Sequence, residues 1–112
     1  METKFHGRGI VEIIDDNLLI KEADDMFTLF WINDCSTILL RKEHFVDDFF
    51  NLSTGIAGEI LQKFSTYRMR MAIIGDFENI KSKALNDFIY ESNKTRRILF
   101  VKTLEDALKI FE

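Results

Sequence analysis

The sequence predicts one α/β domain over residues 1–112, with a mixed, mostly parallel sheet of four or five strands, an N-terminal hairpin and four helices. Short β-branched and apolar runs alternate with segments whose apolar residues recur every three or four positions, which is the order expected of βαβ units. The length of 112 residues suits one domain. Hydrophobic residues make up 46% of the chain, which is enough for one core.

The N-terminal part of the chain predicts a hairpin followed by a helix. Residues 4–6 and 10–14 are short strand-like runs on either side of the Gly-Arg-Gly turn at 7–9. From Ala23 to Phe30 the apolar residues recur at helical spacing, and the first turn carries acidic residues, which the helix dipole favours there. We expect this helix to end at Asn33.

The middle of the chain predicts a strand, a helix and a buried strand. Residues 37–41 predict a short strand, and residues 43–51 an irregular segment or one helical turn. The apolar residues within 56–64 share one face of a helix. Residues 69–74 form a continuous apolar run that ends at a Gly-Asp pair, which is typical of a strand covered on both faces.

The C-terminal part predicts a helix, a strand and a last helix. Ser82 is a favourable N-cap for a helix that we expect to end at Asn93. Residues 98–101 predict the final strand. Thr103 and Asp106 bound a segment that resembles a capping box, and an apolar helical stripe follows it. Strands that alternate with helices in this way indicate parallel pairing after the hairpin.

Charge and cysteine content limit the function classes. A net charge of −4 argues against a general nucleic-acid-binding protein, because such proteins use Lys and Arg to neutralise phosphates. The single cysteine, Cys35, excludes an internal disulfide and favours a reducing, cytoplasmic compartment. Two histidines and one cysteine form no recognisable zinc motif, so we expect no metal and no cofactor. The apolar runs are too short for a signal peptide or for a helix that crosses a bilayer, so we expect no membrane as a partner.

The start of the predicted second helix is the leading candidate site. A hydroxyl there either caps free backbone N–H groups or accepts a phosphoryl group whose charge the helix dipole stabilises. Asn51, Gly55, Gly58 and Gln62 share one stripe of the helix. Glycine costs about 1 kcal/mol relative to alanine inside a helix, so we expect the stripe to pack against other backbone or to form a flat docking surface. The candidate binding and regulatory residues are Ser53, Thr54, Gly55, Gly58, Glu59 and Gln62.

An alternative site is expected where the strands end. Open α/β sheets bind ligands at the carboxyl ends of their strands, and a histidine among carboxylates suits general acid–base catalysis or a divalent cation. This small-ligand or enzyme site would comprise Glu43, His44, Asp47, Asp48 and Asp76. The other interpretation is that these are solvated loop charges.

Basic residues are expected at the opposite end of the sheet, where the strands begin. They are Arg68, Arg70, Lys94, Arg96 and Arg97. Such a group is either a solvated surface or a patch for an anion or an acidic partner.

Trp31, Phe49 and Phe50 are expected in the core or covering the sheet, and an exposed aromatic among them would indicate an interface. A homo-oligomer built on surplus aromatic residues or a sheet edge is a further alternative.

Several segments carry a family resemblance: residues 49–64, Tyr67 with Arg68, residues 72–77, residues 81–83 and residues 87–93. Through them most of the chain, from about Glu22 onward, resembles a bacterial family known as domain of unknown function 4180. This resemblance implies no particular activity.

The Ser-Thr-Gly segment at 53–55 begins the second helix. Together with the order of elements, it resembles the STAS domains of bacterial anti-sigma-factor antagonists. In that family a Ser or Thr at this helix start is phosphorylated by a partner kinase, and the surface beside it binds the partner. The resemblance implies a STAS-like fold, phosphorylation at Ser53 or Thr54, and a protein partner such as a kinase or an anti-sigma factor. STAS antagonists usually carry Asp before this serine, where this chain has Leu52. From the resemblance as a whole, we expect a regulatory, protein-binding module rather than an enzyme.

Overall fold

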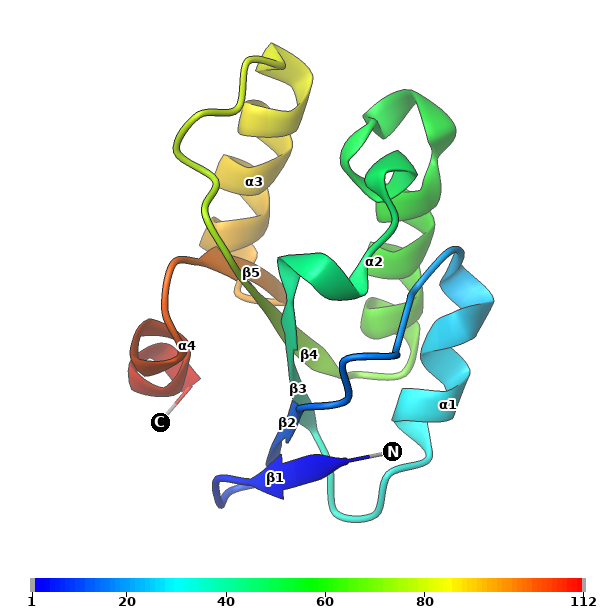
Figure 1. The fold of residues 1–112 in the computed structure, drawn as a ribbon, viewed down its shortest axis with the longest axis vertical. Coiled ribbons are helices and arrows are strands. Elements are labelled where there is room, and N and C mark those ends of the chain that lie inside the picture. The colour runs from blue at the N-terminus through cyan, green and yellow to red at the C-terminus, as the bar shows by residue number, and fades with distance from the viewer. Residues whose placement is uncertain (1, 112) are drawn as a thin grey trace.

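A computed structural model describes residues 2–111 and has the predicted α/β architecture (Figure 1). Within these residues, one sheet has the strand order β1-β2-β3-β4-β5. β1 and β2 pair antiparallel, and every later pair is parallel, so the N-terminal hairpin and the mostly parallel sheet are confirmed. The strands are β1 Thr3–Phe5, β2 Ile10–Ile13, β3 Thr37–Arg41, β4 Arg70–Ile74 and β5 Ile98–Val101.

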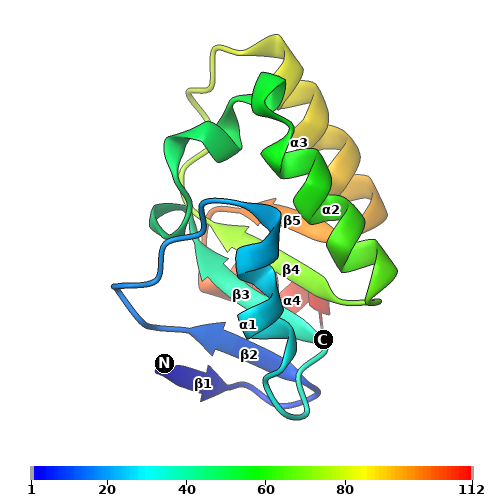
Figure 2. The ribbon, with the colours of Figure 1, turned by 90° about the vertical axis from the view of Figure 1, so that its right-hand side faces the viewer.

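The helices lie on both faces of the sheet. Their bounds are α1 Phe27–Phe30, α2 Ile56–Thr66, α3 Lys83–Thr95 and α4 Leu104–Phe111. α1, preceded by a 3-10 turn over Ala23–Met26, packs with α2 and α3 against one face, and α4 covers the other (Figure 2). Because each right-handed crossover moves one strand further in the same direction, α1, α2 and α3 must share a face. Among residues 2–111, no helix has the length and apolar character needed to cross a bilayer.

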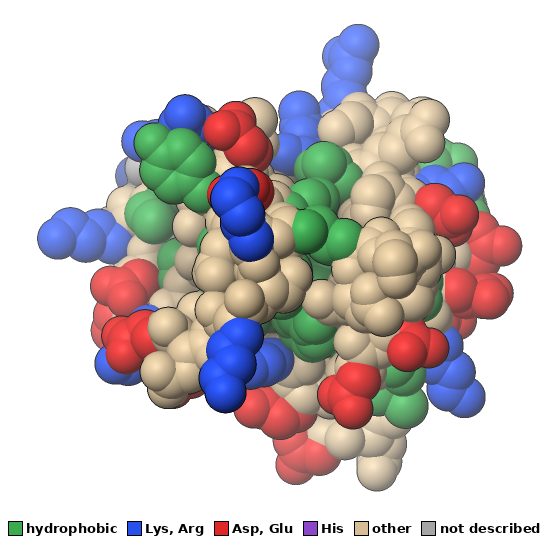
Figure 3. Space-filling view, turned by 90° about the horizontal axis from the view of Figure 1, so that it is seen from above, with side chains coloured by type: hydrophobic (Ala, Val, Ile, Leu, Met, Phe, Trp, Pro, Cys, Tyr) green, Lys and Arg blue, Asp and Glu red, His purple; other side chains and the backbone are tan. Residues whose placement is uncertain are grey.

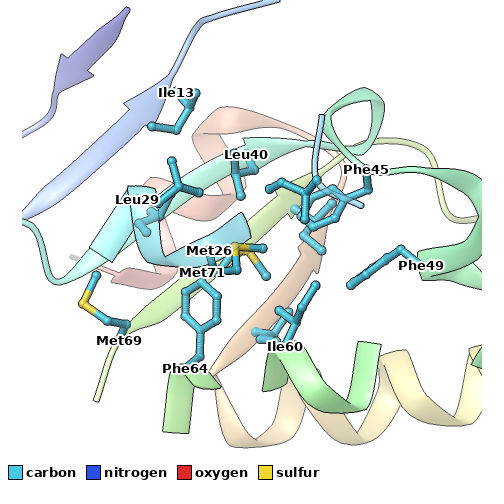
Figure 4. Close-up of a cluster of buried hydrophobic side chains, with 14 of the residues drawn as sticks. Ile13, Met26, Leu29, Leu40, Phe45, Phe49, Ile60, Phe64, Met69 and Met71 are labelled. Atoms are coloured by element: carbon cyan, nitrogen blue, oxygen red, sulfur yellow. The ribbon is translucent and has the colours of Figure 1, made fainter. Parts of the chain in front are cut away.

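The two faces of the sheet enclose cores of different size. The larger core lies between the sheet and the three helices, where Leu40, Met71 and Phe64 are fully buried (Figure 4). The smaller core lies under α4 and includes Leu39 and Ala107. The continuous apolar run of β4 follows from this arrangement, because its side chains point alternately into one core and the other.

The C-terminal half follows the predictions except at Asn93. The Ser82 hydroxyl accepts a hydrogen bond from the Leu85 amide at 3.2 Å, which confirms the predicted cap of α3. The prediction that α3 ends at Asn93 is wrong, since the helix continues to Thr95. The Asn93 amide group instead accepts from the Phe100 N–H at 2.8 Å and donates to the Phe100 carbonyl at 3.3 Å. It thereby pairs with the free edge of β5, which would otherwise offer these groups to another strand.

The segment between β3 and α2 is more ordered than predicted. It contains 3-10 turns over Lys42–His44, Asp47–Phe50 and Leu52–Thr54. The turns are held by aromatic packing, with the rings of Phe45 and Phe49 centred 4.5 Å apart. This segment carries the chain along the strand-exit end of the sheet to the start of α2, where the leading candidate site was expected.

Candidate functional site

The N-cap residue of α2 is a glycine, and the two predicted hydroxyls lie just before it. Gly55 is the N-cap residue and has φ +81°, in the left-handed region that glycine adopts without a steric penalty. The Ser53 hydroxyl donates to Asn51 Oδ1 at 2.7 Å. The Thr54 hydroxyl lies 2.8 Å from the Asp48 carbonyl oxygen and 3.4 Å from the Ile56 amide nitrogen. Ser53 is exposed, and its hydroxyl is bonded to Asn51 and not to the first turn of α2.

The glycine stripe of α2 faces solvent. A Cβ atom built at Gly55 or at Gly58 has no heavy atom of the described chain within 4 Å, apart from its neighbouring residues and the backbone of its own helix. Glu59 and Gln62, further along the same flank, are exposed too. The sequence left two interpretations of this stripe: close packing against other backbone, or a flat docking surface. Close packing against the described chain does not occur, so the flank of the helix is bare. The start of α2 lies at the end of the molecule seen in Figure 3.

A groove runs between the bare flank of α2 and the turn that precedes α1. It encloses about 310 Å³ and is lined by Ala23, Asp24, Glu59, Gln62, Lys63, Thr66 and Tyr67. The structure therefore brings two predicted residues, Glu59 and Gln62, onto one groove. The opposite wall was not foreseen, because the sequence does not show which segment packs beside α2.

An aromatic hollow adjoins this groove. It encloses about 100 Å³ and is lined by Phe27, Phe30, Trp31 and Tyr67, of which Tyr67 also lines the groove. The Tyr67 ring centre lies 5.5 Å from that of Phe27 and 5.3 Å from that of Phe30. Lys63 Nζ stands 5.1 Å from the Phe27 ring centre, a cation–π contact.

The expectation that Trp31 belongs to the core or covers the sheet is wrong, because its side chain is 83% exposed. Phe49 is buried as expected, and Phe50 is half-buried. Trp31 follows the last residue of α1 as its C-cap, and it lines the hollow with Phe27, Phe30 and Tyr67.

The alternative site is only partly assembled. Glu43 and Asp47 line one open hollow of about 400 Å³ beside Phe50, whereas Asp48 and Asp76 are not part of its lining. The Asp76 carboxylate accepts the Glu78 N–H at 3.0 Å. In the view of Figure 3, onto the strand-exit end, hydrophobic side chains show in the middle of the face and most charged groups stand near its margin. Within residues 2–111, no three His, Cys, Asp or Glu side chains are grouped to hold a metal ion.

His44 is a buried structural residue in this arrangement. It is 2% exposed, its Nδ1 accepts the Arg41 backbone N–H at 3.0 Å, and its Nε2 donates to the Asp15 carbonyl at 3.0 Å. Removal from water lowers the pKa of His44 from its ordinary value of 6.5, although the hydrogen bond to Asp15 opposes this shift. With both ring nitrogens bonded to backbone, the imidazole has no free nitrogen for a substrate.

Comparison with known proteins gives a family and no closer relative. No curated protein and no solved structure matches the chain. The family model described as domain of unknown function (DUF4180) matches residues 5–110, which is nearly the whole chain and includes α2, the groove and the aromatic hollow. The chain is therefore a member of the DUF4180 family.

Proposed function

We propose that this chain is a regulatory module that binds a protein partner through one face. The face consists of Ser53, Thr54 and the bare flank of α2, together with the adjoining groove and aromatic hollow; we call it the α2 face. The observation that carries the proposal is the open space at Gly55 and Gly58. Glycine at Gly58 costs about 1 kcal/mol of helix stability, and nothing in the described chain uses the missing side chain. A partner that packs closely against the helix would use it.

The composition of the α2 face supports this proposal. Trp, Tyr and Arg dominate the binding energy of protein interfaces, and such residues cluster in a centre surrounded by polar groups. Trp31 and Tyr67 are exposed here beside the small, flat stripe of α2, with Asp24, Glu59 and Lys63 around them. The resemblance to STAS antagonists implies the same helix start as the contact region.

The α2 face is tested with two substitutions of Gly58. Gly58→Ala should raise the free energy of unfolding by about 1 kcal/mol, because alanine favours the helix and the site has room for a methyl group. Gly58→Arg should also keep the fold, since arginine is a good helix former, but its side chain would cover the flank. Thermal or urea unfolding followed by circular dichroism measures both effects.

Partner binding is then measured with a photo-crosslinking residue at Gln62 and, as a matched control, at Glu105 on α4. In cells of the source organism, we expect a specific crosslinked protein from position 62 only. Gly58→Arg should abolish this product, and Gly58→Ala should preserve it. Equal products from both positions, or a product that survives Gly58→Arg, would contradict the proposed face.

Phosphorylation of Ser53 is the proposed switch. The hydroxyl is exposed and precedes α2, so an added phosphate would lie near the positive end of the helix without disturbing the core. Ser53→Asp should change the affinity for the crosslinked partner by about tenfold, since one charge-assisted contact is gained or lost. Ser53→Ala should bind as the unmodified protein does. The affinities are compared by biolayer interferometry, and identical values for Ser53→Asp and Ser53→Ala would exclude the switch.

A further inference from the structure

Another cavity lies at the opposite end of the sheet, where the parallel strands begin. It encloses about 330 Å³ and is lined by Arg8, Ile10, Ser36, Thr37, Arg68, Arg70 and Phe111. Four segments that are far apart in the sequence meet here: the hairpin turn, the entry to β3, the entry to β4 and the end of α4. The sequence indicated Arg68 and Arg70 at this end but not Arg8, whose place depends on how the hairpin packs.

Among residues 2–111, the arginines of this cavity form no ion pair. Within that range no carboxylate lines the cavity, and the ion pairs involve other cations. Acidic residues outnumber basic ones in this protein, with 19 against 15, so partners were available elsewhere on the chain. Like charges that share one cavity repel each other unless an anion lies between them.

The polar groups of the cavity are held in place by backbone hydrogen bonds. The N–H groups of Ser36 and Thr37 both donate to the Gly9 carbonyl, at 2.9 and 3.0 Å, and the Arg70 N–H donates to the Ser36 carbonyl at 3.0 Å. A Cβ at Gly9 would lie 2.5 Å from Ser36 Oγ, so glycine is required for this close approach. Thr37 lies directly across the sheet from Ile10 on one side and from Arg70 on the other.

Thr37 and two of the arginines have further features that bear on this site. Thr37 is 4% exposed and lines the cavity. Arg8 and Arg68 have φ +53° and +55°, a left-handed conformation that is unfavourable for a residue with a long side chain. At Arg68 this conformation follows the end of α2, and it fixes where the arginine stands at the entry to β4.

We propose that this cavity binds a phosphate-type oxyanion, either as the free ion or as the phosphomonoester of a small molecule. Arginine is the side chain best suited to it, because its planar group donates two parallel hydrogen bonds to oxygens of one anion. The Thr37 and Ser36 hydroxyls supply further donors. The cavity lies at the strand-entry end, whereas α2 begins at the strand-exit end, so this site is separate from the α2 face.

The test is a titration of the ¹⁵N-labelled protein followed by NMR, using inorganic phosphate, phenyl phosphate and, at matched ionic strength, sodium chloride. Both phosphates, or one of them, should produce saturable shifts at the amides of Arg8, Ser36, Thr37 and Arg70. Tighter binding of phenyl phosphate would identify an organic phosphate as the ligand. Tighter binding of inorganic phosphate would identify the free ion as the ligand. Arg70→Gln should weaken binding about tenfold, as expected for the loss of one charge-assisted contact.

Arg68→Asn and Arg96→Asn form a matched pair. Both arginines have a left-handed backbone, at φ +55° and +59°, and asparagine tolerates this conformation better, so both variants should fold at least as stably as the parent. Only Arg68 lines the cavity. Arg68→Asn should therefore weaken phosphate binding about tenfold while Arg96→Asn leaves it unchanged. Equal losses in the two variants, or the same shifts with chloride, would show general charge screening and overturn the site.

Discussion

Replacing Phe64 with alanine should lower the free energy of unfolding by about 3–5 kcal/mol, the range for deleting a fully buried aromatic ring. Phe64 is 0% exposed and lies in the larger core, and its ring packs edge-on against Phe30 with the centres 5.0 Å apart. Small domains have a total stability of about 5–15 kcal/mol, so this one substitution removes a large part of it. Urea unfolding followed by circular dichroism measures the change.

Phe5→Ala is the matched control. Phe5 is 56% exposed on the edge strand β1, so its removal should cost well under the Phe64 value. Phe64 also supports the aromatic hollow through Phe30, so Phe64→Ala should weaken partner binding together with stability. A loss below about 1 kcal/mol for Phe64→Ala would mean that α2 does not pack on the sheet as described.

His44→Leu should destabilise the protein by about 3 kcal/mol at neutral pH. Leucine fills a similar space but leaves the Arg41 N–H and the Asp15 carbonyl without their partners, and each buried unsatisfied group costs about 1–3 kcal/mol. A stability loss of this size assigns His44 to the scaffold. A loss well below about 1 kcal/mol, measured by chemical denaturation, would contradict this structural role.

The same residue predicts how stability depends on pH. Burial lowers the pKa of His44 in the folded protein, so below about pH 6.5 the unfolded chain takes up a proton that the folded chain does not. The unfolded state then binds more protons, and the free energy of unfolding falls as the pH falls from 6.5 toward the lowered native value. The His44→Leu variant should lack this component, which a comparison of urea unfolding at pH 7.5 and pH 5.5 would reveal.

The sequence predicted those parts of the fold that depend on local patterns. The strands at residues 37–41 and 98–101 were placed correctly because each is an apolar run between polar turns. Asn93 was misjudged, since asparagine commonly ends helices and its pairing with Phe100 is a tertiary contact. The series of 3-10 turns before α2 was missed for a similar reason, because their stability comes from packing among Phe45, Phe49 and Phe50.

The candidate sites were predicted to a smaller extent. The glycine stripe of α2 was recognisable, since two glycines near a helix start are costly without a purpose. The second wall of its groove and the exposure of Trp31 depend on where the turn before α1 packs. Arg8 joins Arg68 and Arg70 only because the hairpin turn lies beside the entries to β3 and β4. Sites that combine distant segments require the folded chain.

The unbroken strand order β1-β2-β3-β4-β5 affects how the protein forms during synthesis. Each strand pairs with the one made just before it, so a strand leaving the ribosome finds its neighbour already present, and the sheet can grow in the direction of translation. The helix side is covered step by step as α1, α2 and α3 emerge. The other side stays uncovered until residues 104–111 arrive, so the nascent chain is most prone to aggregate just before α4 docks.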